Sequence, residues 1–406
     1  MSSGFILYDD AAARAAEPFA LTRPFGELRV GATVVRERWE RVLNAKAAGF
    51  IGAAHLEAFA EFGAPGSVTG VLKAGTLLVN ARCAPNLIAR VAAPAAGGAV
   101  RCGGVIAAVA LARDVNVSEL GGGQVPLDEL ASVRVAARGD ADLAVNGWWL
   151  TAAWDLIRLL PDVLVADAAA LAAAIPDEPP AHVDVLGEHR FAVARGAYVE
   201  PQVVVDTTAG DVVVMEGARI SAFARLAGPI VIGAHTQVAG GRYSCVAVGE
   251  HSRVCGEMSV VSVQGHANKG HDGFVGHSVI GRWANLGAGT ITSNLKNSYG
   301  QVRVRDSRGE HDTGMQFLGS LIGDHVKVAI GTRLNTGTII GAGSNLFGDS
   351  GPPKYVEPFS WGQDGMYDTY ALQKFLAVAS LAMQRRSVAL TPALRATLTA
   401  AWNAAN

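Results

Sequence analysis

A six-residue repeat in the second half of the chain constrains its fold more than any other feature. Each copy has an aliphatic residue, a glycine, two unrestricted positions and a small residue. The aliphatic side chain fits a narrow triangular column, the glycine lets the backbone turn a corner, and the small residue fits beside that corner, where a larger one would clash. Such repeats are typical of a parallel β-helix, whose stacked coils bury one continuous aliphatic core. The copies are Ile232–Thr236, Ile280–Ala284, Leu286–Thr290, Ile322–Val326 and Ile340–Ser344.

Length and charge narrow the class of protein. A chain of 406 residues exceeds the usual size of one domain, and half of it is hydrophobic. The net charge of -2 gives no electrostatic reason to expect nucleic acid or an anionic membrane as a partner. The four cysteines are widely spaced, and the first residues lack the apolar run of a signal peptide. We expect a cytoplasmic protein.

Breaks in the pattern suggest three segments. Strand-like runs at residues 5–8 and 76–79 alternate with helical stretches at 34–43 and 154–160, which predicts an α/β domain over residues 1–178. Clustered prolines follow, and a left-handed β-helix is expected over residues 183–350. After Leu346 the repeat register is expected to be lost, so residues 351–406 are interpreted as an irregular connection followed by helices at 366–386 and 392–402.

The densest group of polar residues lies inside the repeats. Gly265–Gly276 contains His271, and Asn285 and Asn294 follow it closely. Because coils stack at strand spacing, residues about 18 apart lie nearly above one another, so these three side chains are expected to line one groove. An imidazole with a pKa near 6.5 is suited to removing a proton from an attacking amine, and side-chain amides can stabilise an oxyanion.

The stretch from Gly270 to Asn294 resembles the acetyltransferase half of the GlmU-like family, which belongs to the hexapeptide-repeat acyltransferases. That half joins an acetyl group from acetyl-CoA to glucosamine-1-phosphate. A group of sugar nucleotidyltransferases in the same superfamily resembles the chain from Leu21–Pro24 through Phe359–Gly362. The resemblance implies an α/β nucleotidyltransferase-like domain, a left-handed parallel β-helix with C-terminal helices, and a homotrimer that builds each site between subunits.

The resemblance also implies roles for individual residues. His271 matches the general base, while Asn285 and Asn294 match side chains that hold the sugar and the acetyl donor. Glu257 matches a carboxylate of the same groove, and Arg242 lies within a residue of an arginine that grips the sugar phosphate.

The chain departs from the family at two of these positions. The substrate-binding lysine of the family falls at Ser259, and a tyrosine near the base is replaced by Phe274. The missing charge is expected from Lys269, Lys296, Arg303 or Arg305.

The first domain departs further from its family. The resemblance implies a glycine-rich phosphate loop after the first strand and an aspartate that binds Mg²⁺. Here the loop after Tyr8 has no glycine, and Arg82 stands where the aspartate belongs, although a cation cannot bind Mg²⁺. Two readings of this domain stay open: a divergent nucleotidyltransferase that uses Asp9 or Asp10 for metal, or a degenerate binding domain. The candidate nucleotide-binding residues are Asp9, Asp10, Arg14, Thr22, Arg23 and Arg82.

A zinc hydratase of the γ-carbonic anhydrase type is a second hypothesis for the β-helix. His266 and His271 are five residues apart, a spacing such sites use, and His251 or His235 would supply a third imidazole. The asparagine-bearing stretch after His271 favours acyl transfer instead. The sequence therefore predicts an acetyl-CoA-dependent N-acetyltransferase for an amino-sugar phosphate in UDP-N-acetylglucosamine or cell-envelope synthesis. It is also compatible with a nucleotidyltransferase that lacks acyl transfer and with a non-catalytic trimer that binds nucleotide sugars.

Overall fold

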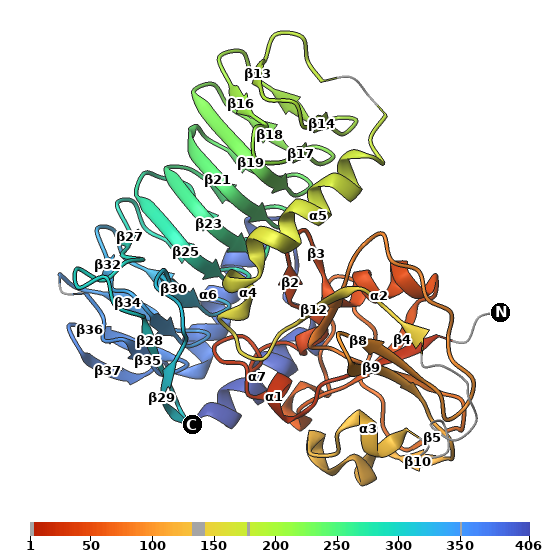
Figure 1. Ribbon diagram of the computed structural model, residues 1–406. Coiled ribbons are helices and arrows are strands. Elements are labelled where there is room, and N and C mark those ends of the chain that lie inside the picture. The colour runs from red at the N-terminus through yellow and green to blue at the C-terminus, as the bar shows by residue number, and fades with distance from the viewer. Residues whose placement is uncertain (1–3, 132–142, 177–178, 350) are drawn as a thin grey trace. The chain divides into compact units, whose positions relative to one another are not determined.

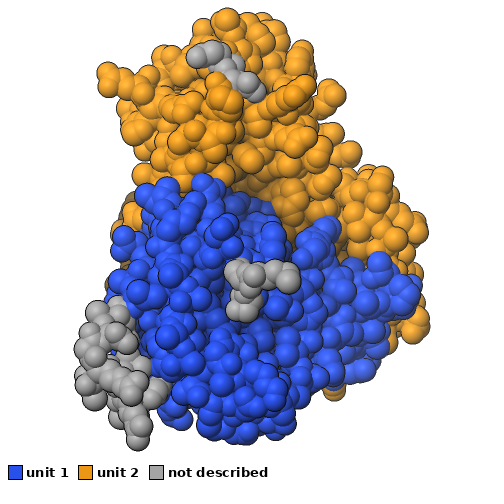
Figure 2. Space-filling model, turned by 90° about the vertical axis from the view of Figure 1, so that its right-hand side faces the viewer, with its two compact units in different colours: residues 1–16, 20–152, 391–404 blue, residues 17–19, 153–390, 405–406 orange. Residues whose placement is uncertain are grey.

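A computed structural model describes residues 4–131, 143–176, 179–349 and 351–406 (Figure 1). They divide into two compact units (Figure 2). The first comprises residues 1–16, 20–152 and 391–404, and the second comprises residues 17–19, 153–390 and 405–406. The expected boundary at residue 178 lies outside the described residues and stays a prediction.

The first unit is built on a mixed six-stranded sheet with β1 next to its edge strand β4. Strands β4 and β6 run parallel to β1, and β9 runs antiparallel to both β6 and β8. All four residues of β1 and of β6 are buried, as the two apolar runs predicted. In spatial order the strands are β11 (Leu143–Ala144), β8 (Ala99–Cys102), β9 (Val105–Ala110), β6 (Leu77–Asn80), β1 (Phe5–Tyr8) and β4 (Ala47–Ile51).

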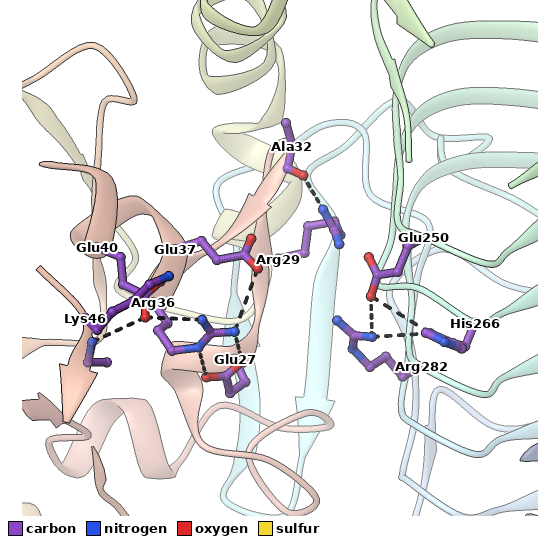
Figure 3. A network of polar contacts seen from close by, with 11 residues as sticks. Glu27, Arg29, Ala32, Arg36, Glu37, Glu40, Lys46, Glu250, His266 and Arg282 are labelled. Atoms are coloured by element: carbon purple, nitrogen blue, oxygen red, sulfur yellow. Dashed lines mark hydrogen bonds and ion pairs between the residues drawn. The ribbon is translucent and has the colours of Figure 1, made fainter. Parts of the chain in front are cut away.

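Short helices and two-stranded ribbons complete this unit. The predicted helix at 34–43 is confirmed as α2 (Val35–Leu43), whose buried Arg36 donates from Nε to Glu27 Oε1 at 2.6 Å (Figure 3). The other elements are α1 (Ala11–Arg14), α3 (Leu127–Leu130), α7 (Pro392–Ala405), β2 (Arg29–Val30) with β3 (Thr33–Val34), β5 (Val71–Leu72) with β10 (Val115–Asn116), and β7 (Cys83–Pro85) with β12 (Gly147–Trp149). Three 3₁₀ helices cover Phe25–Glu27, Ala54–Leu56 and Val117–Gly123.

The second unit is a parallel β-solenoid, which confirms the fold class predicted from the repeats. Aliphatic side chains from successive coils form one continuous core, as the repeat frame required. One long sheet contains β13 (Asp184–Leu186), β14 (Phe191–Val193), β16 (Val204–Asp206), β17 (Val212–Val214), β19 (Ala224–Ile232), β21 (Gly241–Val248), β23 (Glu257–Val263), β25 (Phe274–Ile280), β30 (Ser320–Ile322), β33 (Thr338–Ile340) and β35 (Tyr355–Val356). The other contains β15 (Tyr198–Val199), β18 (Arg219–Ile220), β20 (Gln237–Val238), β22 (Arg253–Val254), β24 (Asn268–Lys269), β26 (Asn285–Leu286), β31 (Lys327–Val328), β34 (Asn345–Phe347), β36 (Ser360–Gln363) and β37 (Met366–Thr369).

The repeat glycine is needed for a reason other than the one expected. A Cβ on Gly281 would lie 2.5 Å from the carbonyl carbon of Gly323, so the neighbouring coil leaves no room for a side chain. The left-handed backbone of the corner falls two residues later, where His235, Trp283 and His325 have φ of 57°, 60° and 59°. The coil-to-coil packing, and not a positive φ, therefore requires glycine at this position.

Helices cover one flank of the solenoid. α4 (Asp155–Arg158) and α5 (Leu160–Ala172) pack along β17, β19, β21, β23 and β25 (Figure 1). Val231, Ala247 and Val279 alternate with inward-facing residues of these strands, yet each is at most 3% exposed because the helices lie over them. We call this surface the helix-covered face.

The solenoid extends further toward the C-terminus than expected. The strand register continues beyond Leu346, because Ile339 pairs with Tyr355 and Asn345 pairs with Trp361. The helix expected over 366–386 begins only at Leu372 (α6, Leu372–Gln384), because Met366–Thr369 instead forms β37 and pairs with β36. The helix expected over 392–402 is confirmed as α7.

A long loop interrupts the coils between residues 294 and 317. It follows β27 (Ile291–Thr292), which pairs with β32 (Arg333–Leu334), and it contains a hairpin of β28 (Arg303–Asp306) and β29 (Gly309–Asp312). Among the described residues, no helix has the length and apolar character needed to span a bilayer.

Candidate functional site

The turn that carries His271 links β24 to β25 at a corner of the solenoid. The imidazole of His271 is exposed and has no hydrogen-bond partner among the described residues. Its backbone is held from inside, because the buried ammonium of Lys269 donates to His271 O at 2.5 Å and to Asp272 O at 2.6 Å. Gly289 N also donates to Asp272 O, at 3.2 Å. The imidazole of the predicted base therefore has no hydrogen bond to the described residues, while the backbone of its turn is held by hydrogen bonds.

One side of this corner presents charged side chains, and we call it the arginine–glutamate face. Arg242, Glu257 and Phe274 are in register on three successive coils. The Arg242 guanidinium pairs with Glu257 at 2.8 Å, with both groups open to solvent. Ser259, where a lysine was expected, lies in register between Ser244 and Gly276. The face therefore brings together the predicted Arg242 and Glu257. Its third residue, Phe274, follows Asp272 of the His271 turn by two positions.

The two predicted asparagines lie on different sides of the solenoid. Asn285 is in β26 and accepts from Asn268 Nδ2 at 2.9 Å, on a surface that we call the asparagine face. Asn294 lies beyond the arginine–glutamate face, where its Nδ2 donates to His277 Nδ1 at 2.8 Å. Within one chain, His271, Asn285 and Asn294 therefore do not line a single groove, contrary to the expectation. The coils are also shorter than 18 residues here, since Arg253 pairs with Asn268 and Asn268 with Asn285.

The environment of Asn294 includes an aromatic contact. His277 stacks on Phe317 with ring centroids 5.2 Å apart, and burial lowers the pKa of its imidazole. A neutral imidazole is needed for Nδ1 to accept from Asn294, so the lowered pKa fits this hydrogen bond. A Cβ on Gly276 would lie 2.6 Å from Asn294 Nδ2 and 2.5 Å from the Phe274 ring, so glycine is required between them.

Two lysines were expected to supply charge to a substrate. Lys269 is 1% exposed and its ammonium is engaged with backbone carbonyls, so the structure gives it a place inside the column. This corrects the expectation, because a buried ammonium cannot reach a ligand on the surface. Lys296 is exposed on the long loop, where it donates to Gln301 O, and its substrate role stays a prediction.

The histidines proposed for zinc lie at two different corners. His235, His251 and His266 stack on one another at 4.9 Å spacing, and His266 packs against Trp283 at 4.4 Å. Burial and nearby Arg282 lower the pKa of His266 to about 3, and Arg282 pairs with Glu250 at 2.6 Å (Figure 3). His271 lies at the following corner. Within the part of the chain that the structure describes, no three His, Cys, Asp or Glu side chains come together in a group that could hold a metal ion.

In the first unit, Asp10 and Arg82 meet at the ends of β1 and β6. Arg82 Nη2 lies 2.7 Å from Asp10 Oδ2, and Asn80 Nδ2 donates to the same oxygen at 2.9 Å. The other oxygen caps α1 through Ala13 N at 3.0 Å. Burial would raise the pKa of Asp10, but the hydrogen bonds and charge of Arg82 outweigh it and the pKa is lowered. These residues do not fit Mg²⁺, because the guanidinium already occupies the carboxylate.

Asp9 lies fully inside the first unit and is a poor metal ligand for a different reason. Its Oδ2 accepts from Phe25 N at 2.9 Å, while its Oδ1 is buried without a hydrogen-bond partner among the described residues. Burial raises the pKa of this carboxyl to about 7. Asp9 is therefore a buried group that is partly protonated near neutral pH.

Two of the predicted nucleotide-binding residues are part of the interior. Arg23 is 3% exposed and pairs with Glu61 at 3.0 Å, and Thr22 is 4% exposed. Their burial contradicts the expectation that these side chains contact a nucleotide. The pairing of a buried guanidinium with a buried carboxylate gives Arg23 a structural role instead.

Three consecutive glycines from a distant segment lie beside Arg14. Gly121, Gly122 and Gly123 have φ of 57°, 64° and 97°, and a Cβ on Gly123 would lie 2.7 Å from Arg14 Nε. Arg14 Nε donates to Asp9 O at 2.8 Å, and its two terminal nitrogens have no hydrogen-bond partner among the described residues. Three consecutive glycines were a visible signal that the sequence analysis did not use.

Comparison with known proteins gives a family for the first domain. Residues 5–174 match the model of the sugar nucleotidyl transferase family. A bifunctional sugar-1-phosphate nucleotidylyltransferase/acetyltransferase of Sulfurisphaera tokodaii is 35% identical over 77 residues, 19% of each chain. A bifunctional protein GlmU of Methanococcus maripaludis is 38% identical over 74 residues, 18% of each chain.

Each alignment thus spans about a fifth of the relative, so the likeness to these two proteins is distant. The family match and the strand pairing together define the architecture. The chain combines a sugar nucleotidyl transferase domain with a C-terminal parallel β-solenoid.

Proposed function

We propose that the solenoid transfers an acetyl group from acetyl-CoA to the amine of an amino-sugar phosphate. The observation that carries this proposal is the exposed imidazole of His271, free of hydrogen bonds to the described residues and mounted on a turn that is held from inside. A general base must have an unoccupied lone pair, which this side chain has, and the backbone that carries it is held in place. The distant bifunctional acetyltransferase relative supports the same chemistry.

The proposed step is nucleophilic acyl transfer. His271 takes a proton from the substrate ammonium or from the amine as it attacks the thioester carbon, and a C–N bond forms. The tetrahedral intermediate then collapses with cleavage of the C–S bond, and the CoA thiolate leaves and takes up a proton. The products are an N-acetyl sugar phosphate and CoA.

The neighbouring side chains suit the substrate part of this reaction. On the arginine–glutamate face, Arg242 offers a guanidinium for a phosphate and Glu257 offers a carboxylate for a sugar hydroxyl or ammonium. The ion pair of these two groups is exposed, so a phosphate can displace the carboxylate at little cost. Asn285 and Asn294 would donate to the sugar or the acetyl oxygen.

The positions of the asparagines favour a site completed by a second chain. Asn285 and Asn294 lie on different sides of the solenoid, so one chain cannot direct both at the same substrate. A trimer that brings the asparagine face of one chain toward the arginine–glutamate face of another would do so. Light scattering during size-exclusion chromatography tests this arrangement, and a monomer contradicts it.

The test of the acetyltransferase measures CoA thiol release with glucosamine-1-phosphate and related amino-sugar phosphates. H271Q should reduce turnover at least about a hundredfold, since general-base contributions are about 10²–10⁴-fold. H189Q is the matched control, because His189 is also exposed but lies in the first coil. Equal turnover by wild type and H271Q contradicts the assignment, and no turnover by wild type with any amine favours a non-catalytic binding protein.

For the first domain we infer that Arg14 and the loop Gly121–Gly123 bind the phosphates of a nucleotide or nucleotide sugar. The free guanidinium nitrogens and the consecutive left-handed glycines support this function, because both suit a close approach of anionic oxygens. Titration calorimetry with UTP, dTTP and UDP-sugars tests it. R14M should weaken binding at least tenfold, whereas R113M, at an exposed ion pair, should not. Pyrophosphate release with a sugar-1-phosphate separates transfer from binding alone.

A further inference from the structure

Lys269 occupies a position in the solenoid where the other coils have an aliphatic residue. In the sheet of β22, β24, β26 and β31, Val254 pairs with Lys269, and Leu286 pairs with Val328. Val254, Leu286 and Val328 all belong to the aliphatic core. The lysine side chain therefore starts from an inward-facing position and is 1% exposed.

An ammonium in this position is unfavourable unless it has a specific use. Burying a charged group costs free energy that hydrogen bonds must offset, and an aliphatic residue would fill the core without that cost. Burial lowers the pKa of the Lys269 ammonium, as expected for a cation removed from water. The butyl stem of a lysine can fill apolar space while its charged end reaches a polar group.

The polar groups that Lys269 reaches are those of the His271 turn. Its ammonium donates to the carbonyls of His271 and Asp272, at 2.5 and 2.6 Å. It also lies 3.3 Å from the place that a Cβ on Gly273 would occupy, so the turn is packed directly on the charge. One cation thus fixes two consecutive peptide groups of the segment that carries the imidazole.

A second lysine whose ammonium donates to backbone carbonyls provides an internal comparison. Lys327 in β31 is half-buried and pairs with Asn285, so unlike Lys269 it starts from an outward-facing position, and its ammonium donates to Trp283 O at 2.7 Å and His325 O at 3.2 Å. Burial lowers its pKa to about 8. Lys327 thus holds carbonyls at the corner of Trp283 and His325, and its contacts do not include the His271 turn.

We propose that Lys269 is a positioning residue that fixes the direction of the His271 imidazole. The inference rests on the proposed acetyl transfer at His271. Removal of the ammonium leaves the His271 carbonyl without a donor and the Asp272 carbonyl with Gly289 N alone, so the turn relaxes and the imidazole no longer has one direction. Misplacement of a catalytic group by about 1 Å can cost about a hundredfold in rate without a contact to substrate being lost.

The experiment compares K269M with K327M, because methionine retains most of the stem and removes the charge in both. K269M should lower kcat about tenfold to a hundredfold with KM changed less than about threefold. K327M should retain kcat within about threefold. The amide of Gly289 donates to Asp272 O, one of the two carbonyls held by Lys269, so its hydrogen exchange should accelerate in K269M and not in K327M.

The outcomes separate the two proposals. If K269M and K327M reduce kcat equally, or if K269M acts only on KM, Lys269 is not a positioning residue. If wild type has no acetyltransferase activity, the proposed function fails, but the exchange of Gly289 still tests the effect of Lys269 on the turn. Unchanged exchange in K269M overturns the inference in either case.

Discussion

The buried carboxyl of Asp9 gives a prediction about stability and pH. Burial raises its pKa from 3.8 to about 7 in the folded protein, and its Oδ1 has no partner among the described residues. At a pH between these two pKa values, Asp9 has lost its proton in the unfolded chain but keeps it in the folded chain. Folding is therefore linked to proton binding, and the contribution of Asp9 to stability falls as the pH rises from about 4 to about 7.

The size of this effect follows from the pKa. At about 1.4 kcal/mol per pH unit, a rise from 3.8 to about 7 corresponds to about 4 kcal/mol of stability that is present at pH 4 and lost at pH 8. D9N cannot ionise, so this pH dependence should disappear from the variant. D10N should act in the opposite sense, because the pKa of Asp10 is lowered and its contribution is present at neutral pH and lost in acid.

The assay is urea unfolding between pH 4 and 8. Unfolding is monitored through hydrogen exchange of peptides from β1 and β6, because these peptides report on the first unit alone. Wild type should lose stability relative to D9N as the pH rises. A difference between the two proteins that stays constant over this range refutes the argument from burial.

Three further predictions test the packing. G276A should lower the thermal midpoint and also reduce acetyl transfer, because the new Cβ meets the Phe274 ring and Asn294 Nδ2; a normal midpoint with full activity contradicts this geometry. I232A should cost about 2–5 kcal/mol in urea unfolding, as Ile232 is fully buried in the column, whereas I291A, at a residue 41% exposed, should cost less than about 1 kcal/mol. R82M should cost about 2–3 kcal/mol by leaving Asp10 without its cation, and D10N should remove most of that penalty in the double variant; additive effects count against the ion pair.

The periodicity of the sequence was sufficient to predict the solenoid, because each coil repeats the same local requirement. The same reasoning failed at the C-terminal end. Tyr355–Val356 and Ser360–Gln363 continue the strands although their sequence lacks the glycine frame, since pairing with the preceding coil determines their conformation. The reason given for the glycines was also wrong, because a close approach between coils is visible only once the coils are stacked.

The candidate site was less predictable, because it depends on which side chains are buried. The family resemblance grouped Arg242 with Glu257, and these two residues pair in adjacent coils. Lys269 and Arg23 were interpreted as ligands for an anion, since a sequence does not show that a charged residue points inward. The approach of Gly121–Gly123 to Arg14 joins segments more than a hundred residues apart, which no local pattern reveals.

The central claim is that His271 promotes transfer of an acetyl group to a sugar amine. The most direct measurement incubates wild type and H271Q with glucosamine-1-phosphate and acetyl-CoA labelled with ¹³C in the acetyl group, and identifies products by mass spectrometry. The account predicts a labelled N-acetyl sugar phosphate from wild type and at least about a hundredfold less from H271Q. Equal labelled product from both proteins would contradict it.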